Sequence, residues 1–144
     1  MSESLRQALE VVIDREAPNL RALADSTIQA RTGWSPKEEL GHLIDSAANN
    51  HQRFVRAALD GSMEGPGYEQ NAWVELHGYA NLPWTMLIDF WERYNRLLAV
   101  VIGRIPADRL GAPCIIGGKA PVTLGFVIED YILHLQHHLD HIMQ

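Results

Sequence analysis

Residues 131–142 read Tyr-Ile-Leu-His-Leu-Gln-His-His-Leu-Asp-His-Ile, and this stretch decides how the rest of the chain is interpreted. It holds four of the seven histidines and neither glycine nor proline, so one helix can run through it. At about 100° per residue, all four imidazoles lie on one face, beside an apolar stripe. The histidines are His134, His137, His138 and His141, and the stripe is Ile128, Leu135, Leu139 and Ile142. Imidazoles bordering a buried face either bind something or are satisfied by other polar groups.

Three more segments with apolar residues at helical spacing precede this stretch. The first runs from about Ser4 to Arg31, the second from Pro36 to about Leu59, and the third begins at Pro83. Pro18 lacks a backbone donor and predicts a kink or a break in the first segment. Thr123 is the expected cap of the last helix, which reaches the end of the chain.

The start of the second helix is the clearest local signal in the sequence. Ser35 can cap it, Pro36 suits the first helical position, and Glu38 completes a capping box. His42 then falls beside the apolar stripe of this helix, whereas His51 projects roughly opposite. His42 is therefore the histidine of this helix that is expected to face the other helices.

The connections favour a bundle with one long crossover. Residues 61–82 form the longest connection, with a short helix expected around residues 71–77, and a link of this length can return the chain to the opposite end of a bundle. Residues 106–122 are rich in proline and glycine and surround a β-like run at 114–116, which indicates a loop or small hairpin. We therefore predict an all-α, four-helix bundle that forms one domain over residues 1–144.

Composition excludes several classes of function. The formal net charge of −6 and the scattered basic residues argue against nucleic-acid binding. No apolar stretch is long enough to span a membrane, and the first residues lack the pattern of a signal peptide. The single cysteine, Cys114, cannot form an internal disulfide, which indicates a reducing cytoplasm and a small structural thiol.

The spacing of the late histidines is suited to metal binding. Histidines at i and i+4 can chelate one divalent ion, and both His134 with His138 and His137 with His141 have that spacing. Periodicity does not choose between the two pairs. His42 is the best candidate for a third ligand from another helix, and three histidines would leave coordination positions open, as in catalytic sites.

The histidine cluster has other interpretations besides a metal site. The histidines can form an ordinary polar helix face, or a pH switch. A di-iron centre is disfavoured, because it needs two Glu-x-x-His motifs and the sequence offers only Glu39-Leu-Gly-His42. Four histidines lie beside the inward face of the last helix, and His42 lies beside the inward face of the second helix. This arrangement favours the metal site.

The motifs together resemble the DinB/YfiT superfamily of metal-dependent enzymes, over essentially the whole chain. They are Trp34-Ser35-Pro36-Lys37-Glu38-Glu39-Leu40-Gly41-His42-Leu43-Ile44-Asp45, Pro121-Val122-Thr123-Leu124 and Asp130-Tyr131-Ile132-Leu133-His134-Leu135-Gln136-His137-His138. The resemblance implies an up-down-down-up helix order and a homodimer. It also implies that His42, His134 and His138 bind nickel, zinc or a similar divalent ion. The additional His137 and His141 depart from the family pattern.

The resemblance also guides the expected chemistry. It implies a small-molecule substrate and metal-dependent activation of a low-molecular-weight thiol for transfer to an electrophile. A metal-hydroxide hydrolase and a non-catalytic, stress-associated metal-binding bundle are the alternatives. Asp130 is expected either to orient a ligand imidazole or to be an exposed acid. Three residues of the long connection are expected either to line the mouth of the site or to cap the core: Trp73, His77 and Tyr79.

Overall fold

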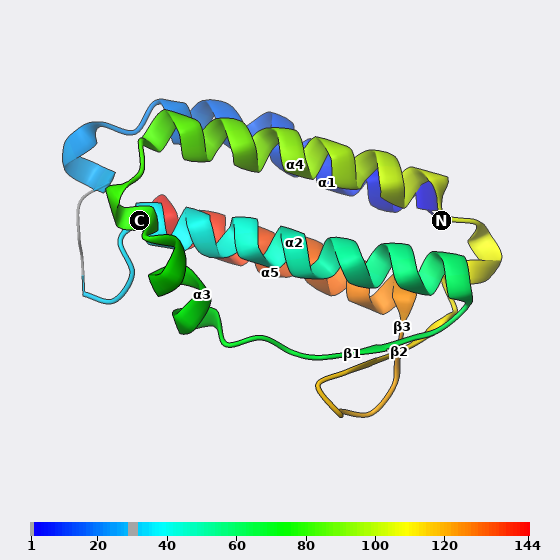
Figure 1. Ribbon diagram of the computed structural model, residues 1–144. Coiled ribbons are helices and arrows are strands. Elements are labelled where there is room, and N and C mark those ends of the chain that lie inside the picture. The colour runs from blue at the N-terminus through cyan, green and yellow to red at the C-terminus, as the bar shows by residue number, and fades with distance from the viewer. Residues whose placement is uncertain (1, 29–31) are drawn as a thin grey trace.

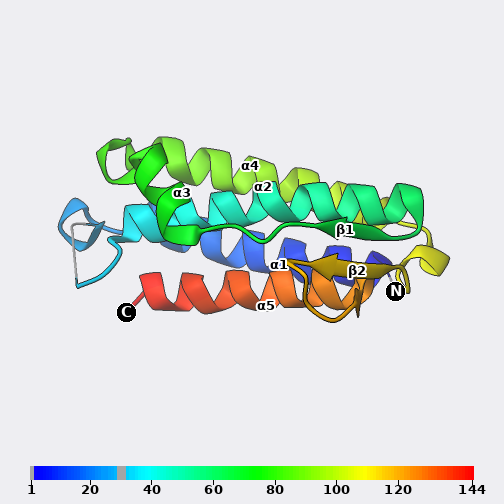
Figure 2. The same ribbon diagram turned by 60° about the horizontal axis from the view of Figure 1, so that its bottom comes forward.

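The computed structural model describes residues 2–28 and 32–144, and four long helices dominate it (Figure 1). They are α1 (Ser2–Arg21), α2 (Pro36–Asp60), α4 (Trp84–Arg104) and α5 (Leu124–Ile142). Helices α1 and α5 run in one direction and α2 and α4 in the other, as both ribbon views show (Figures 1 and 2). The predicted all-α, up-down-down-up bundle is therefore confirmed.

The packing of the bundle follows from this order of directions. Helix α4 contacts both α1 and α2, and α5 contacts the same two helices. The contact between α2 and α5 brings residues about 90 positions apart in sequence side by side. None of the described helices has the length and apolar character needed to cross a membrane.

Helix α2 begins as predicted. The Ser35 hydroxyl accepts a hydrogen bond from the Glu38 backbone N–H at 3.2 Å, and the Glu38 carboxylate accepts one from the Ser35 N–H at 3.0 Å. Pro36 occupies the first turn, and Gly61 ends the helix in the left-handed region at φ 81°. This reciprocal cap fixes the start of the helix and therefore the direction in which its first two turns point.

The prediction for the first segment was wrong at its C-terminal end. Helix α1 ends at Arg21, and a short 3-10 turn follows at Asp25–Ile28. The Leu20 carbonyl accepts a hydrogen bond from the Trp84 indole, and the Thr27 hydroxyl donates to the Ala24 carbonyl. These contacts use backbone acceptors that a continued helix would need. The predicted end at residues 29–31 lies outside the described residues, and Pro18 lies within α1.

The two long connections meet in a small sheet. Strand β1 (Met63–Gly65) pairs in parallel with β2 (Pro113–Ile116), which pairs antiparallel with β3 (Val122–Thr123). The predicted hairpin is present. Strand β1 was not predicted, because a segment of three residues is too short to show a periodic pattern. The crossover continues through α3 (Gln70–His77) and a 3-10 turn at Tyr79–Asn81, and another such turn, Ala107–Arg109, precedes β2.

The core lies between the four long helices and extends beneath the small sheet. The apolar stripe of α5 is buried as predicted, with Leu135, Leu139 and Ile142 each at most 1% exposed. Cys114 is buried in β2, and its thiol points to the Ala112 carbonyl at 3.6 Å, in agreement with a structural role. Thr123 caps α5 by accepting from the Phe126 N–H at 3.1 Å. This cap and the buried stripe fix the face of α5 that carries the histidines.

Candidate metal centre

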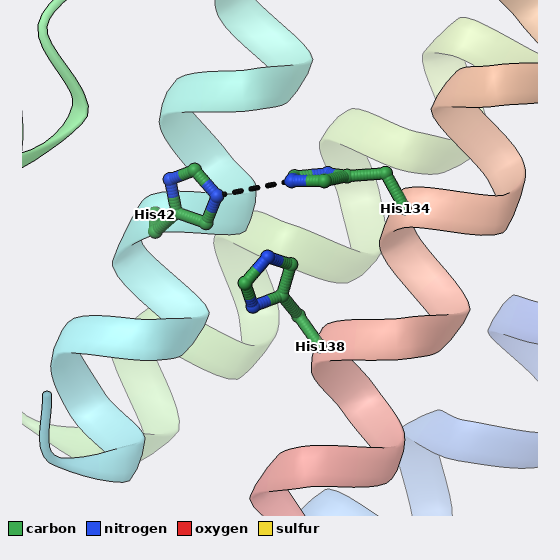
Figure 3. A group of neighbouring side chains, drawn as sticks. All are labelled: His42, His134 and His138. Atoms are coloured by element: carbon green, nitrogen blue, oxygen red, sulfur yellow. Dashed lines mark hydrogen bonds between the residues drawn. The ribbon is translucent and has the colours of Figure 1, made fainter.

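Three imidazoles from two helices come together near one end of the bundle (Figure 3). His42 projects from α2, and His134 and His138 project from successive turns of α5. The ring centroids are 5.1 Å apart for His42 and His134, 4.7 Å for His42 and His138, and 4.5 Å for His134 and His138. We call these residues the three-histidine group. Among the described residues it is the one set of three or more histidine, cysteine and acidic side chains close enough to hold a metal ion together.

The nitrogen positions fit a divalent ion. The Nε2 atoms of His42 and His134 lie 3.2 Å apart, and one ligand nitrogen from each of the three residues lies within 4.8 Å of the others. Two ligands at 2.0–2.1 Å in a tetrahedral zinc site are separated by about 3.3 Å. The Nε2 atoms of His42 and His134 already have about that separation.

Glu39 holds one ring of the group in place. Its two carboxylate oxygens lie 2.8 Å from Nδ1 of His138 and 2.6 Å from Nδ1 of His141. When Nδ1 of His138 donates to this carboxylate, the lone pair of the ring is on Nε2 and is available for a metal. Burial alone would raise the pKa of Glu39, but the hydrogen bonds from the two histidines outweigh it and hold that pKa below its ordinary value.

Of the two alternatives expected for Asp130, the structure shows the exposed acid. Asp130 is exposed, and no hydrogen bond joins it to His134 in the described part of the chain. Glu39 takes the orienting role, and the sequence contained a signal for it. It lies three residues before His42, so both project from one face of α2, across from α5.

The remaining histidines lie outside the group. His141 is held by Glu39 with its side chain about half exposed, and His137 is exposed, with its ring centroid 5.3 Å from that of His138. His51 contacts the Tyr94 hydroxyl through Nδ1 at 2.9 Å, away from the group. The structure therefore pairs His134 and His138 with His42, and it leaves the pair His137 and His141 without a third histidine.

Trp34 packs beside the three-histidine group and is partly buried. Its ring centroid lies 4.8 Å from that of His42 and 6.5 Å from that of His138. The tryptophan immediately precedes Ser35, the residue that caps α2. His42 is fully buried, and its Nδ1 has no hydrogen-bond partner in the described part of the chain.

The environment keeps two of the rings neutral. Burial, then the proximity of His134 and His138, lowers the pKa of His42 to about 4, against an opposing effect of Glu39. Burial, then His138, also lowers the pKa of His134 to about 4, with Asp130 opposing. Neutral imidazoles are the form that binds metals, so both rings are ready to act as ligands at neutral pH.

These pKa values predict how the stability of the metal-free protein depends on pH. Because both folded pKa values lie below the ordinary value of 6.5, the unfolded chain binds more protons between pH 6.5 and pH 4. The free energy of unfolding should therefore fall as the pH falls through that window. Urea unfolding at pH 7.5, 6 and 5 measures it. His42→Gln should flatten the dependence, and an equally steep fall in that variant would contradict the assignment.

A cavity of about 320 Å³ adjoins the group along the groove between α2 and α5. His134 lines one part of it, together with Ser46, Tyr68 and Asp130. Trp73, His77 and Tyr79, the residues considered for the mouth of the site, do not line it. A small molecule in this cavity would therefore lie next to the ring of His134.

Tyr79 has a structural role instead. It is buried, its hydroxyl donates to Asp45 at 2.7 Å, and Nδ1 of His77 lies 3.2 Å from the same carboxylate oxygen. Its ring occupies the space that a Cβ on Gly41 would need, since that atom would lie 2.1 Å from Tyr79 Cδ2. Gly41 thus allows the crossover to pack directly against α2, beside His42.

The fold and the group together define a class of protein: an up-down-down-up helical bundle with three imidazoles between two antiparallel helices. Residues 7–142 match the sequence profile of the DinB superfamily. The chain belongs to that superfamily.

Two bacterial relatives carry names that concern activity. The chain is 24% identical to the Bacillus subtilis protein named "Putative metal-dependent hydrolase YfiT", covering 97% of this chain and 75% of that protein. It is also 24% identical to a protein from Oceanobacillus iheyensis that is likewise named a "Putative metal-dependent hydrolase", covering 76% of this chain and 63% of that protein. The solved structure of YfiT superposes on this chain with a TM-score of 0.83 at 20% identity, covering 98% of this chain and 83% of YfiT. That structure is described as a probable metal-dependent hydrolase with an unusual four-helix bundle topology.

Proposed function

We propose that this protein is a metal-dependent enzyme in which His42, His134 and His138 hold one divalent cation, with nickel and zinc the expected ions. The observation that carries the proposal is the convergence of three imidazoles, with no carboxylate among them, beside a cavity of about 320 Å³. Neutral ligands leave both positive charges of such an ion uncompensated. A divalent ion held in this way lowers the pKa of a thiol or a water molecule bound to it.

The substrate we propose is a low-molecular-weight thiol that reacts with an electrophile. The thiol gives its proton to solvent at the open side of the cavity, and a sulfur electron pair forms the new bond to carbon. The leaving group departs with the electrons of the bond that breaks. Glu39 fixes the orientation of His138, and Trp34 keeps water away from His42. We also infer a reducing, cytoplasmic setting, in which a free thiol and the buried Cys114 both stay reduced.

Hydrolysis is the alternative activity, and two observations favour it. The relatives are named as hydrolases, and Asp130 lines the same cavity as His134, where its carboxylate is available to accept a proton from water. In this case Asp130→Asn should lower the rate of ester hydrolysis by about 10²-fold or more. The same substitution should have little effect on thiol transfer, because that reaction needs no general base once the thiol is ionised.

Steady-state assays of zinc- and nickel-loaded protein test the two activities. A panel of thiols with 1-chloro-2,4-dinitrobenzene reports transfer, and 4-nitrophenyl acetate reports hydrolysis. We expect thiol-dependent turnover that His42→Ala abolishes and His51→Ala preserves. Stoichiometric metal binding without turnover of any substrate would instead support a non-catalytic, metal-binding bundle.

We also propose that the protein forms a homodimer. Met86, Phe90, Leu97 and Val100 are each about half exposed on the outer side of α4. A self-complementary apolar stripe of this kind is suited to a twofold interface with a second copy. Light scattering should give twice the chain mass of 16.2 kDa, and a monomer mass would contradict the proposal.

A further inference from the structure

The cavity that begins at His134 also contains cationic groups that the reaction does not use. Arg53 of α2 and Lys119, between β2 and β3, both line it. The Arg53 guanidinium makes hydrogen bonds to the Asn50 side chain at 3.4 Å and to the Pro66 carbonyl at 3.2 Å. Within residues 2–28 and 32–144, no carboxylate lies within salt-bridge distance of it, although the chain as a whole is acidic.

Partial burial makes the charged form of Arg53 less favourable than it would be in water. The side chain is partly buried, and this burial lowers the pKa of Arg53 despite the opposing effects of Tyr68 and Cys114. Asp130 is the one acid that lines the cavity, and in the described part of the chain the Arg53 guanidinium is hydrogen-bonded to Asn50 and Pro66 and makes no ion pair with Asp130. A partly desolvated guanidinium with only neutral partners has unused capacity for a bidentate interaction with an anion.

The helix geometry sets the distance between Arg53 and the three-histidine group. Ser46, Asn50 and Arg53 follow His42 along one face of α2, and all three line the cavity. Arg53 is eleven residues after His42, so their Cα atoms are about 16 Å apart along the axis. Both side chains lean toward the N-terminus of α2, and the Arg53 guanidinium reaches Asn50, which lies nearly one turn closer to the three-histidine group.

We propose that the small molecule activated at the three-histidine group carries a carboxylate at the end remote from its reacting atom, and that Arg53 binds this carboxylate, with Lys119 adding to the positive field. The proposal rests on the proposed function, because it places the reacting end at His134 and assigns the chemical class of the other end. Arg53 then determines specificity, since a ligand without the anion would leave the guanidinium unpaired.

Binding of matched thiols to cobalt-loaded protein tests the inference. The probes are 6-mercaptohexanoate and the neutral 6-mercapto-1-hexanol, titrated by the visible absorbance of the cobalt ion. We expect the carboxylate probe to bind about tenfold or more tightly, because a hydrogen bond between charged groups is worth at least that factor. Arg53→Gln should abolish the difference and Arg53→Lys should retain part of it. Arg56→Gln, which removes an exposed arginine of α2 that does not line the cavity, should leave it unchanged.

The possible outcomes separate this inference from the proposed function. Equal affinities for the two probes in the wild-type protein would overturn the role of Arg53 and leave thiol binding intact. If neither probe changes the absorbance, the proposed thiol chemistry fails. The role of Arg53 is then tested by NMR on metal-free protein titrated with hexanoate. The signal of the Arg53 side-chain Nε–H should shift when the carboxylate binds. An unshifted signal would overturn the inference, and thermal unfolding confirms that each variant is folded.

Discussion

Replacing His134 and His138 together by alanine is expected to abolish retention of a divalent metal. The double variant removes two of three ligand nitrogens and leaves only His42, which alone cannot hold an ion against dilution or a chelator. Elemental analysis of protein purified without an affinity tag, then dialysed, measures the effect. The wild-type chain should retain about one ion per chain and the double variant essentially none.

The other histidines of the chain are the controls for this experiment. His51→Ala and His137→Ala should each retain the metal, because His51 contacts Tyr94 and His137 is exposed beside the group. If the double variant still binds one ion per chain, the ligands are not those proposed. Loss of that ion on replacing His137 and His141 would move the site to the second i, i+4 pair.

Replacing Glu39 by alanine is expected to weaken metal binding by about 10- to 100-fold, although Glu39 is not a ligand. The variant loses the acceptor that fixes the tautomer and the orientation of the His138 ring, and such acceptors typically contribute that factor. Competition with a chromophoric chelator at pH 7.5 measures the dissociation constant. Metal-free stability should be recorded in parallel, because Glu39 is itself buried.

Asp130→Asn is the matched comparison for Glu39→Ala. Asp130 lies on α5 one turn before His134 but makes no hydrogen bond to that ring among the described residues, so its replacement should change the metal affinity by less than about threefold. Equal losses in the two variants would show that general negative charge, rather than the orientation of His138, determines affinity.

The helical bundle was predictable because its signals are local. The capping box at Ser35, the Thr123 cap and the 3.6-residue periodicity each act within one or two turns. The end of α1 also contacts Trp84, more than 60 residues away, whose indole N–H donates to the Leu20 carbonyl. Strand β1 depends in the same way on pairing with β2, and such distant contacts leave no periodic trace in a short segment.

The candidate site was predictable in its histidines and not in their surroundings. The i, i+4 spacing indicated His134 and His138 or the alternative pair, and only the packing of α2 against α5 associates His42 with the first pair. Glu39 precedes His42 by three residues and therefore shares its face of α2, but its partners on α5 follow from the antiparallel register of the two helices. The environment of Arg53 was not predictable, because the absence of an acidic partner among the described residues is a property of the folded chain.

Anomalous diffraction from crystals of the zinc- or nickel-loaded protein is the most direct measurement of whether one cation lies between α2 and α5. The account predicts one strong peak at the metal absorption edge, about 2.0–2.1 Å from a ring nitrogen of each of His42, His134 and His138. A peak beside His137 and His141 in its place, or full metal loading with no peak between the two helices, would contradict it.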